Sequence, residues 1–260
     1  MANNRYLNSI ACLVWLLLMS AQAGAVLISS GARVAPSPAV PGSGLAGAYW
    51  DAGSFGSITD AIAFADGNAP TATFVSTRVD YPNGDVNDVF DGTSLGSYLG
   101  VDAATLSGAA ANTIGTSIFR FTGFINIETG FDMVTGNSTI DIVTTVGSDD
   151  GMRLTVGGQQ IVQFSTPRAF GLTSGMMSFE SAGLYAVDLI YYENGGVTGI
   201  EWLHDSTGLG GATNDGQFLV PASVLYQSAS NGGGNVPVPF TLALVLVGFL
   251  GMGVGRAQRS

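Results

Sequence analysis

The sequence predicts an all-β protein, an antiparallel sandwich or barrel with one short helix. Many short segments alternate apolar and polar side chains, turns rich in Gly, Asn and Ser separate them, and a single stretch has helical periodicity. The 260 residues suit one large β domain or two small domains. The segments expected to form strands are 44–50, 71–79, 118–127, 138–146, 152–156, 159–164, 176–180, 184–192, 197–203 and 222–226.

The clearest element is a hairpin between 147 and 164. From 152 to 156, apolar and polar side chains alternate with a period of two, which indicates a half-buried strand. Two glycines follow at 157–158, and they suit a two-residue hairpin turn because such a turn needs positive φ. Residues 159–164 are then the return strand.

Two neighbouring carboxylates, Asp149 and Asp150, precede this hairpin on a loop at the rim of the expected sheet. Adjacent carboxylates repel each other, and they tolerate this closeness best with a cation between them or with full exposure to water.

The expected helix covers Ser57 to Ala65, where apolar residues recur at helical spacing and Ser57 with Asp60 resembles a capping box. Residues 44–50 before it read as an edge strand. Residues 80–99 read as a long polar loop whose four aspartates lack the spacing of a recognised calcium loop, so we expect solvated turn residues there.

The charge balance excludes nucleic acid as a partner. The chain contains no lysine, and its formal net charge is −11. Residues 26–235 hold five arginines against all 19 acidic residues, a formal charge of −14. Nucleic-acid binding depends on basic residues that neutralise phosphates, so this balance favours metal cations or neutral ligands such as sugars.

The N-terminus has the features of a secretory signal peptide over residues 1–25. Arg5 gives a positive start, 10–19 is apolar, and small residues near 21–25 offer a cleavage site. The apolar run is too short to cross ~30 Å of hydrocarbon. The lone cysteine, Cys12, lies inside this segment, so the exported protein has no disulfide. Residues 26–43, rich in proline, are expected to be a linker.

The C-terminus combines a second linker, 228–235, with an apolar run, 240–255, and two terminal arginines. Sixteen apolar residues at ~1.5 Å each give about 24 Å, and the flanking residues allow insertion with the arginines on the cytoplasmic side. With Val236-Pro237-Val238-Pro239, the segment 236–260 resembles the PEP-CTERM sorting tail of Gram-negative bacteria, in which a glutamate stands where this chain has Val238. The resemblance implies a transmembrane helix as a transient inner-membrane anchor, cleaved by an exosortase-type protease.

The region 44–227 resembles the PA-14 domain, the β-sandwich named after the anthrax protective antigen. The resemblance rests on motifs in a fixed order, which are fairly specific together although each is weak alone. They are Gly44-Leu45-Ala46-Gly47-Ala48-Tyr49-Trp50, Gly147-Ser148-Asp149-Asp150-Gly151-Met152-Arg153-Leu154, Gly183-Leu184-Tyr185, Tyr191-Tyr192-Glu193-Asn194, Ile200-Glu201-Trp202 and Val220-Pro221-Ala222-Ser223-Val224-Leu225-Tyr226. It implies an antiparallel β-sandwich as the fold of this domain.

The adhesin members of that family bind calcium through paired aspartates and an asparagine on a second loop, and the calcium ligates sugar hydroxyls. The resemblance therefore implies Ca²⁺ as the cofactor, held by Asp149, Asp150 and Asn194. In the alternative, the aspartates only brace the loops. Glu193 and Asp188 are possible additional ligands, and the aromatic side chains of Tyr192 and Trp202 either stack on a sugar or pack in the core, with core packing favoured.

No enzymatic motif stands out. The single histidine, His204, follows a strand end and reads as a surface residue, and no nucleophile elbow, zinc cluster or phosphate-binding loop with lysine is found. Acidic residues are plentiful, but the sequence places no pair opposite another as a glycosidase requires. We therefore expect a non-enzymatic protein.

Two functions remain open. The first is an exported adhesion or carbohydrate-binding module at the cell surface or in the extracellular matrix, dependent on calcium, with a glycan or exopolysaccharide as partner. The second is a structural protein of the exopolysaccharide matrix that binds no small molecule. Accessory action in polysaccharide processing is a third, weaker hypothesis.

Overall fold

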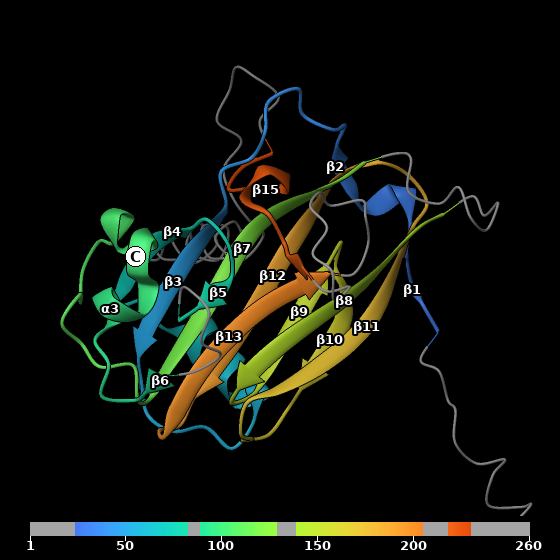
Figure 1. Cartoon of the computed structure of the whole chain (residues 1–260). Coiled ribbons are helices and arrows are strands. Elements are labelled where there is room, and N and C mark those ends of the chain that lie inside the picture. The colour runs from blue at the N-terminus through green and yellow to red at the C-terminus, as the bar shows by residue number, and fades with distance from the viewer. Residues whose placement is uncertain (1–23, 83–88, 129–138, 205–217, 230–260) are drawn as a thin grey trace, which may run out of the picture.

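The computed structural model describes residues 24–82, 89–128, 139–204 and 218–229, which form two packed β-sheets (Figure 1). The expected sandwich is confirmed, and nearly all pairs of neighbouring strands are antiparallel. One exception is the first strand, which runs parallel to its neighbour. The signal peptide, the C-terminal apolar run and the sorting motif lie outside the described residues. No helix in the described ranges is long and apolar enough to span a membrane.

The first sheet, sheet A, has the strand order β1-β11-β8-β13-β14, and β5 and β6 also pair with β13. The strands are β1 (Val26–Ile28), β5 (Asp80–Tyr81), β6 (Val89–Phe90), β8 (Ile140–Asp149), β11 (Gly171–Phe179), β13 (Val197–His204) and β14 (Phe218–Leu219).

The second sheet, sheet B, has the order β10-β9-β12-β7-β3-β4, with β2 paired to β12 and β15 paired to β7. Its strands are β2 (Arg33–Ala35), β3 (Leu45–Asp51), β4 (Ala72–Ser76), β7 (Ser117–Ile127), β9 (Met152–Val156), β10 (Gln159–Phe164), β12 (Gly183–Glu193) and β15 (Leu225–Tyr226). The helices are α2 (Ile58–Gly67), α3 (Leu95–Leu99) and the 3-10 turns η1 (Ser30–Ala32), η2 (Gly100–Thr105) and η4 (Ala222–Val224).

The main core lies between the sheets and is rich in aromatic side chains. Tyr81 stacks on Phe121 with ring centroids 5.7 Å apart, and Phe119 stacks on Tyr191 at 5.9 Å. The tyrosine hydroxyls need polar partners when buried. Tyr81 donates to the buried carboxylate of Asp102 at 2.6 Å. Its ring therefore packs in the core while its hydroxyl keeps a hydrogen-bond partner.

The sequence placed the hairpin and the helix correctly. Gly157 and Gly158 have φ of +57° and +78° between β9 and β10, as the turn requires. The helix α2 starts after Ser57, whose hydroxyl accepts the amide of Asp60 at 3.2 Å. The alternating apolar side chains of β9 are buried.

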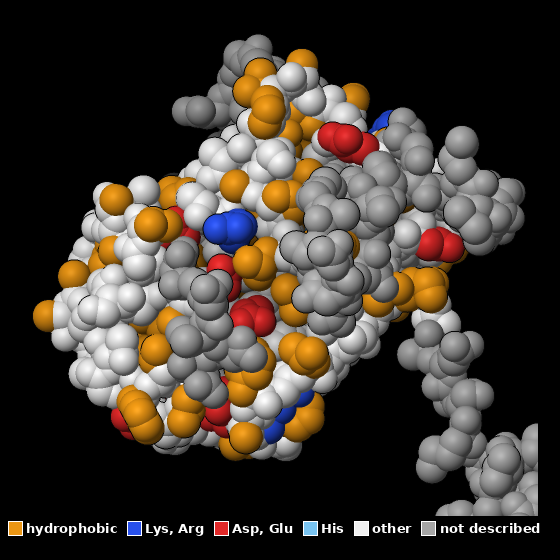
Figure 2. Space-filling view, viewed as in Figure 1, with side chains coloured by type: hydrophobic (Ala, Val, Ile, Leu, Met, Phe, Trp, Pro, Cys, Tyr) orange, Lys and Arg blue, Asp and Glu red, His pale blue; other side chains and the backbone are white. Residues whose placement is uncertain are grey.

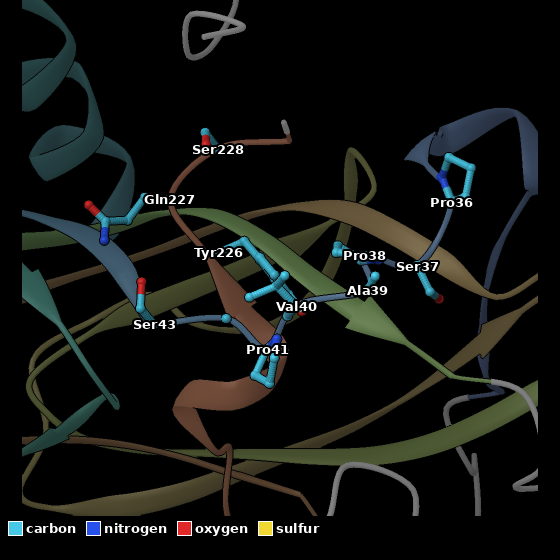
Figure 3. Close-up of a pocket in the computed structure, with 11 residues that line it drawn as sticks. Pro36, Ser37, Pro38, Ala39, Val40, Pro41, Ser43, Tyr226, Gln227 and Ser228 are labelled. Carbon is cyan, nitrogen blue, oxygen red and sulfur yellow. Dashed lines mark hydrogen bonds between the residues drawn. The ribbon is translucent and has the colours of Figure 1, made fainter. Parts of the chain in front are cut away.

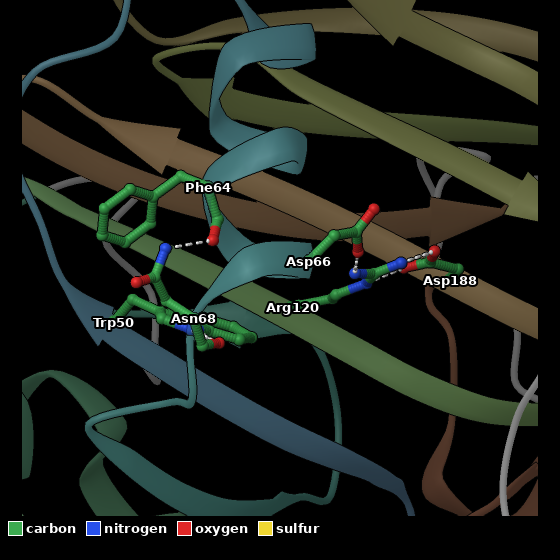
Figure 4. A network of polar contacts seen from close by, with 6 residues as sticks. All are labelled: Trp50, Phe64, Asp66, Asn68, Arg120 and Asp188. Carbon is green, nitrogen blue, oxygen red and sulfur yellow. Dashed lines mark hydrogen bonds and ion pairs between the residues drawn. The ribbon is translucent and has the colours of Figure 1, made fainter. Parts of the chain in front are cut away.

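Helix α2 lies on the outer face of sheet B and is fixed there by a polar network (Figure 4). The guanidinium of Arg120 on β7 bonds the carboxylates of Asp66 and Asp188, each at 2.6 Å. The indole of Trp50 donates to the carbonyl of Asn68 at 2.9 Å. The start of the helix is held separately, because Ile58 N donates to Ser165 O at 2.8 Å and the main chain of Phe55 bonds the side chain of Asn194, directly after β12.

Several expectations need correction. The strand at 44–50 is not an edge strand, because β3 pairs with both β4 and β7. The expected linker 26–43 contains β1, which pairs with β11 in sheet A, and β2, which pairs with β12 in sheet B. Ile28 is fully buried. The polar loop at 80–99 contains β5, β6 and α3, and residues 222–226 begin as a 3-10 turn. Short segments paired to a distant strand carry too little periodicity to be found from local sequence.

Candidate functional site

The candidate site lies where the chain crosses from sheet A to sheet B. Strand β8 ends at Asp149 in sheet A, and β9 begins at Met152 in sheet B, so Asp150 and Gly151 bridge the two layers. The main chain of this bridge pairs with β12, because Asp150 N donates to Tyr192 O at 3.3 Å and Tyr192 N donates to Gly151 O at 3.0 Å. A Cβ on Gly151 would lie 2.5 Å from the Tyr192 ring, so glycine is needed there. The peptide bond between Asp149 and Asp150 is cis.

Three carboxylates meet at this crossing. One oxygen each from Asp149, Asp150 and Glu193 lies within 4.8 Å of the others, and the three residues are 8%, 6% and 0% exposed. We refer to them as the acidic trio. Burial removes the alternative of full exposure to water that the sequence left open, and like charges this close are costly in a dry setting.

Asp150 is held by two main-chain amides from different loops. Arg168 N donates to its Oδ1 at 2.8 Å, and Asn194 N donates to its Oδ2 at 2.9 Å. Burial raises the pKa of Asp150, and these two hydrogen bonds oppose the shift because they favour the ionised form. Asp150 therefore connects the β8–β9 crossing to the β10–β11 and β12–β13 loops.

Glu193 ends β12 with its side chain inside the protein. Its Oε1 accepts Gly195 N at 2.5 Å, and its Oε2 accepts the hydroxyl of Tyr191 at 3.0 Å. The same hydroxyl donates to the carbonyl of Asp149 at 2.6 Å and contacts Thr198. Burial, with a contribution from the charge of Asp150, raises the pKa of Glu193 to about 8. This acid is thus protonated at neutral pH unless a cation is present.

Arg168 is a basic residue beside the trio, and the hydrogen bonds of its guanidinium go to uncharged oxygen atoms. It donates to Ser148 O at 3.1 Å, to Ser148 Oγ at 2.8 Å and to Thr173 Oγ1 at 2.9 Å, and it lies 4.1 Å over the ring of Phe164. Burial lowers the pKa of Arg168, and the negative charges of Asp149 and Asp150 oppose this shift. The guanidinium therefore braces the end of β8 from one side.

The third expected ligand, Asn194, lies beside the trio but its side chain is engaged elsewhere. Its Oδ1 accepts Phe55 N at 2.7 Å, and its Nδ2 donates to Phe55 O at 2.8 Å. The structure thus brings Asp149, Asp150 and the Asn194 main chain together, and adds Glu193, which the sequence offered only as an additional ligand. The signal for Glu193 was its position as the last residue of β12, directly before the asparagine.

The other residues singled out in the sequence do not join the site. Asp188 pairs with Arg120 on the outer face of sheet B. Tyr192 and Trp202 are 0% and 1% exposed, which agrees with the favoured core packing. His204 is 1% exposed at the end of β13 and packs on Phe218, so the expected surface position is wrong.

A separate pocket of about 860 Å³ lies between residues 36–43 and 226–228 (Figure 3). Prolines and main-chain atoms form much of its wall, and Tyr226 donates its hydroxyl to Val40 O at 2.8 Å. No charged side chain lines it. We therefore place the candidate site at the acidic trio, where convergent charged groups are found, and not at this pocket.

The trio fits a hard divalent cation. Calcium takes six to eight oxygen ligands from carboxylates, carbonyls, water and ligand hydroxyls, and the trio supplies carboxylate oxygens only. No histidine or cysteine joins the three among the described residues, which disfavours zinc. The face visible in Figure 2 carries mostly uncharged and apolar side chains with few basic groups, consistent with a ligand that needs no cationic surface.

Solved structures with a similar fold include two PA14 domains. The PA14 sugar-binding domain from an RTX adhesin aligns over 73% of this chain and all of its own, with 23% identity and a TM-score of 0.56. The PA14 domain of the MpAFP antifreeze protein aligns over 76% of this chain and 97% of its own, with 21% identity and a TM-score of 0.59. No protein-family model and no curated protein sequence matches the chain. The fold implied by the sequence motifs is therefore the observed one.

Proposed function

We propose that this protein is an exported adhesion module that binds neutral carbohydrate through a calcium ion held by Asp149, Asp150 and Glu193. The observation that carries the proposal is the burial of three carboxylates within 4.8 Å of one another. A bound divalent cation offsets their repulsion, and vicinal sugar hydroxyls replace water among its remaining ligands.

Two further points support a carbohydrate ligand. One of the proteins that share the fold is a sugar-binding domain of an adhesin. The region 26–235 carries a formal charge of −14, which disfavours nucleic acid and other polyanions and leaves neutral polyols as suitable ligands. No catalytic role is part of the proposal, because the trio is committed to the cation.

The position of the site supports display. Glu193 pairs with Ser117 at one end of β7, whereas Tyr226, near the end of the described chain, pairs with Phe124. Seven residues of strand correspond to roughly 23 Å, so β15, the last described strand, lies far along β7 from the site (Figure 1). The proposal includes export by residues 1–25, transient inner-membrane anchoring by 236–260 and release by an exosortase-type protease to the cell surface or matrix.

The alternative is a structural protein of the exopolysaccharide matrix that binds no small molecule. The hydrogen bonds of Asp150 favour it, because they connect three loops without any ion. In that case the trio only braces the rim.

Calorimetry separates the two functions. The purified protein is titrated with calcium, and a glycan array is then probed with and without chelator. We expect calcium binding, and glycan signals that disappear with chelator and in the double variant Asp149→Asn/Asp150→Asn. The double variant Asp66→Asn/Asp188→Asn is the matched control, because it removes two carboxylates outside the trio. Absence of both calcium binding and glycan signal would leave the structural function.

A further inference from the structure

Phe90 is unusual among the aromatic side chains of this protein. It is 77% exposed, whereas every other aromatic side chain in the described ranges is buried or half-buried. Burying a phenylalanine is worth roughly 1.5–3 kcal/mol. This ring therefore leaves a large apolar surface in water, beside the rim that holds the acidic trio.

The main chain around Phe90 is fixed. Phe90 is the register partner of Val197, the first residue of β13. Asp91 N donates to Gly196 O at 2.9 Å, and Gly196 N donates to Asp91 Oδ2 at 3.2 Å. The Phe90 carbonyl accepts Thr93 N at 2.9 Å. The ring is thus presented from a paired strand end.

The same turn connects Phe90 to the trio. Gly195 and Gly196 lie between Glu193 and Val197, with φ of +106° and +107° that disfavour residues with a side chain. Gly195 N also donates to Glu193, so the turn touches the trio at one end and Asp91 at the other. A Cβ on Gly196 would meet no atom within 4 Å. The space over Gly196 is therefore open, whereas a Cβ on Gly195 would lie 3.6 Å from the carboxylate of Asp91.

We propose that Phe90 is the stacking platform for a neutral pyranose ring whose vicinal hydroxyls complete the coordination of the trio-bound cation. This inference rests on the proposed function and adds the ligand class and a residue that selects it. A pyranose has an apolar C–H face that packs on an aromatic ring and hydroxyls that bind calcium. Asp91 on the turn adds negative charge, which disfavours uronic acids and other anionic sugars.

The test compares a ring with an open chain. The wild-type full-length protein, loaded with calcium, is titrated with methyl hexopyranosides and with mannitol, an acyclic polyol that has vicinal hydroxyls but no ring face. Phe90→Ala removes the platform, Phe90→Trp enlarges it, and Val101→Ala, at another strongly exposed apolar position, is the control.

We expect Phe90→Ala to weaken hexopyranoside binding about three- to tenfold, the range of an aromatic contact, with mannitol and calcium binding unchanged. Phe90→Trp retains or improves hexopyranoside affinity. Unchanged hexopyranoside affinity in Phe90→Ala, or an equal loss for mannitol, would overturn the platform and leave the proposed function standing. If the wild-type protein binds calcium but neither hexopyranosides nor mannitol, the proposed carbohydrate function fails as well.

Discussion

Strand β12 contributes one acid to each of two carboxylate clusters, Asp188 to the first and Glu193 to the second. The two clusters differ in how the repulsion between their carboxylates is offset. At Asp188, on the outer face of sheet B, a carboxylate shares the guanidinium of Arg120 with Asp66. At Glu193, five residues further on, three carboxylates converge, and the nearby guanidinium of Arg168 donates to Ser148 and Thr173 while its charge acts on Asp149 and Asp150. The first cluster has its cation built into the chain, and under the proposed function the second takes one from solution.

The pKa values reflect this difference. The two carboxylates raise the pKa of Arg120 because their charge and hydrogen bonds outweigh burial. Burial raises the pKa of Glu193 to about 8. At the first cluster the opposite charges favour the ionised forms, whereas at Glu193 burial outweighs the hydrogen bonds and favours the protonated form. The following predictions test whether the two clusters differ in this way.

The largest expected effect is on calcium affinity. Glu193→Gln removes one carboxylate charge from the trio, and we expect calcium to bind roughly a hundredfold more weakly because affinity depends on the ligand charge count. The neutral amide keeps the size of the side chain and can still accept the hydroxyl of Tyr191. Calorimetry with Asp188→Asn as the matched variant measures the difference. Equal affinities in the two variants would show that Glu193 is not a ligand.

The next effect is on stability at the compensated cluster. Arg120→Met leaves Asp66 and Asp188 without their shared cation on a partly covered surface. We expect a loss of about 2 kcal/mol in unfolding free energy, below the usual cost of breaking a buried pair because both acids are partly exposed. Chemical denaturation measures it. Calcium affinity stays unchanged in this variant, and a fall in that affinity would mean that the two clusters are coupled.

The pH dependence of stability separates the clusters further. Glu193 has a folded pKa of about 8 against 4.5 for the unfolded chain, so its contribution is complete below pH 4.5 and is lost as pH rises to 8. We expect the calcium-free protein to lose stability across this window. With calcium the loss disappears, because the cation favours the ionised carboxylate, and calcium binding tightens as pH rises.

A control is needed for this pH window, because burial and the charge of Asp80 raise the pKa of Glu201 to about 7 in the same direction. Thermal unfolding of Glu193→Gln keeps the contribution of Glu201, so the difference from wild type reports Glu193 alone. We expect Glu193→Gln to be the more stable protein at pH 8 without calcium. The interpretation of the trio fails if wild type and variant have the same pH profile.

The sequence predicted the elements that depend on local pattern. The hairpin after Asp150 and the helix after Ser57 were found because a period of two, a glycine pair and a capping serine are short-range signals. The position of Asp149 and Asp150 directly before the hairpin followed from the same pattern, but the expected loop was wrong for Asp149, which is the last residue of β8. Family resemblance added the sandwich and a calcium role, and the fold comparison confirms the sandwich.

The sequence could not predict what depends on long-range pairing. β1 joins β11 across about 150 residues of chain, and β6 joins β13 across about 100, so neither has a local signature. Whether Glu193 or Asn194 is the third side chain beside Asp149 and Asp150 depends on which of the two neighbours turns inward at the end of β12. The contact of Asn194 with Phe55 decides it, and that contact depends on where α2 holds the preceding loop.

The smallest effect concerns Asn194, whose side chain holds the main chain of Phe55 by two hydrogen bonds of 2.7 and 2.8 Å. Asn194→Ala removes both but keeps the main-chain amide that Asp150 accepts. We expect a loss of about 1–2 kcal/mol in unfolding free energy. We expect only a few-fold loss of calcium affinity, since the loop loosens but no carboxylate is removed. Denaturation and calorimetry on the same variant give the two numbers.

The ratio of the two losses assigns the role of this residue. Loss of a positioning side chain costs more in stability than in calcium affinity, because such a side chain acts on the ion only through the β12–β13 loop, which follows Glu193 and whose Asn194 amide holds Asp150. A ligand shows the reverse order, with an affinity loss close to that of Glu193→Gln and a small change in calcium-free stability. The second result would restore Asn194 to the ligand set and would require its amide to leave Phe55 when calcium binds.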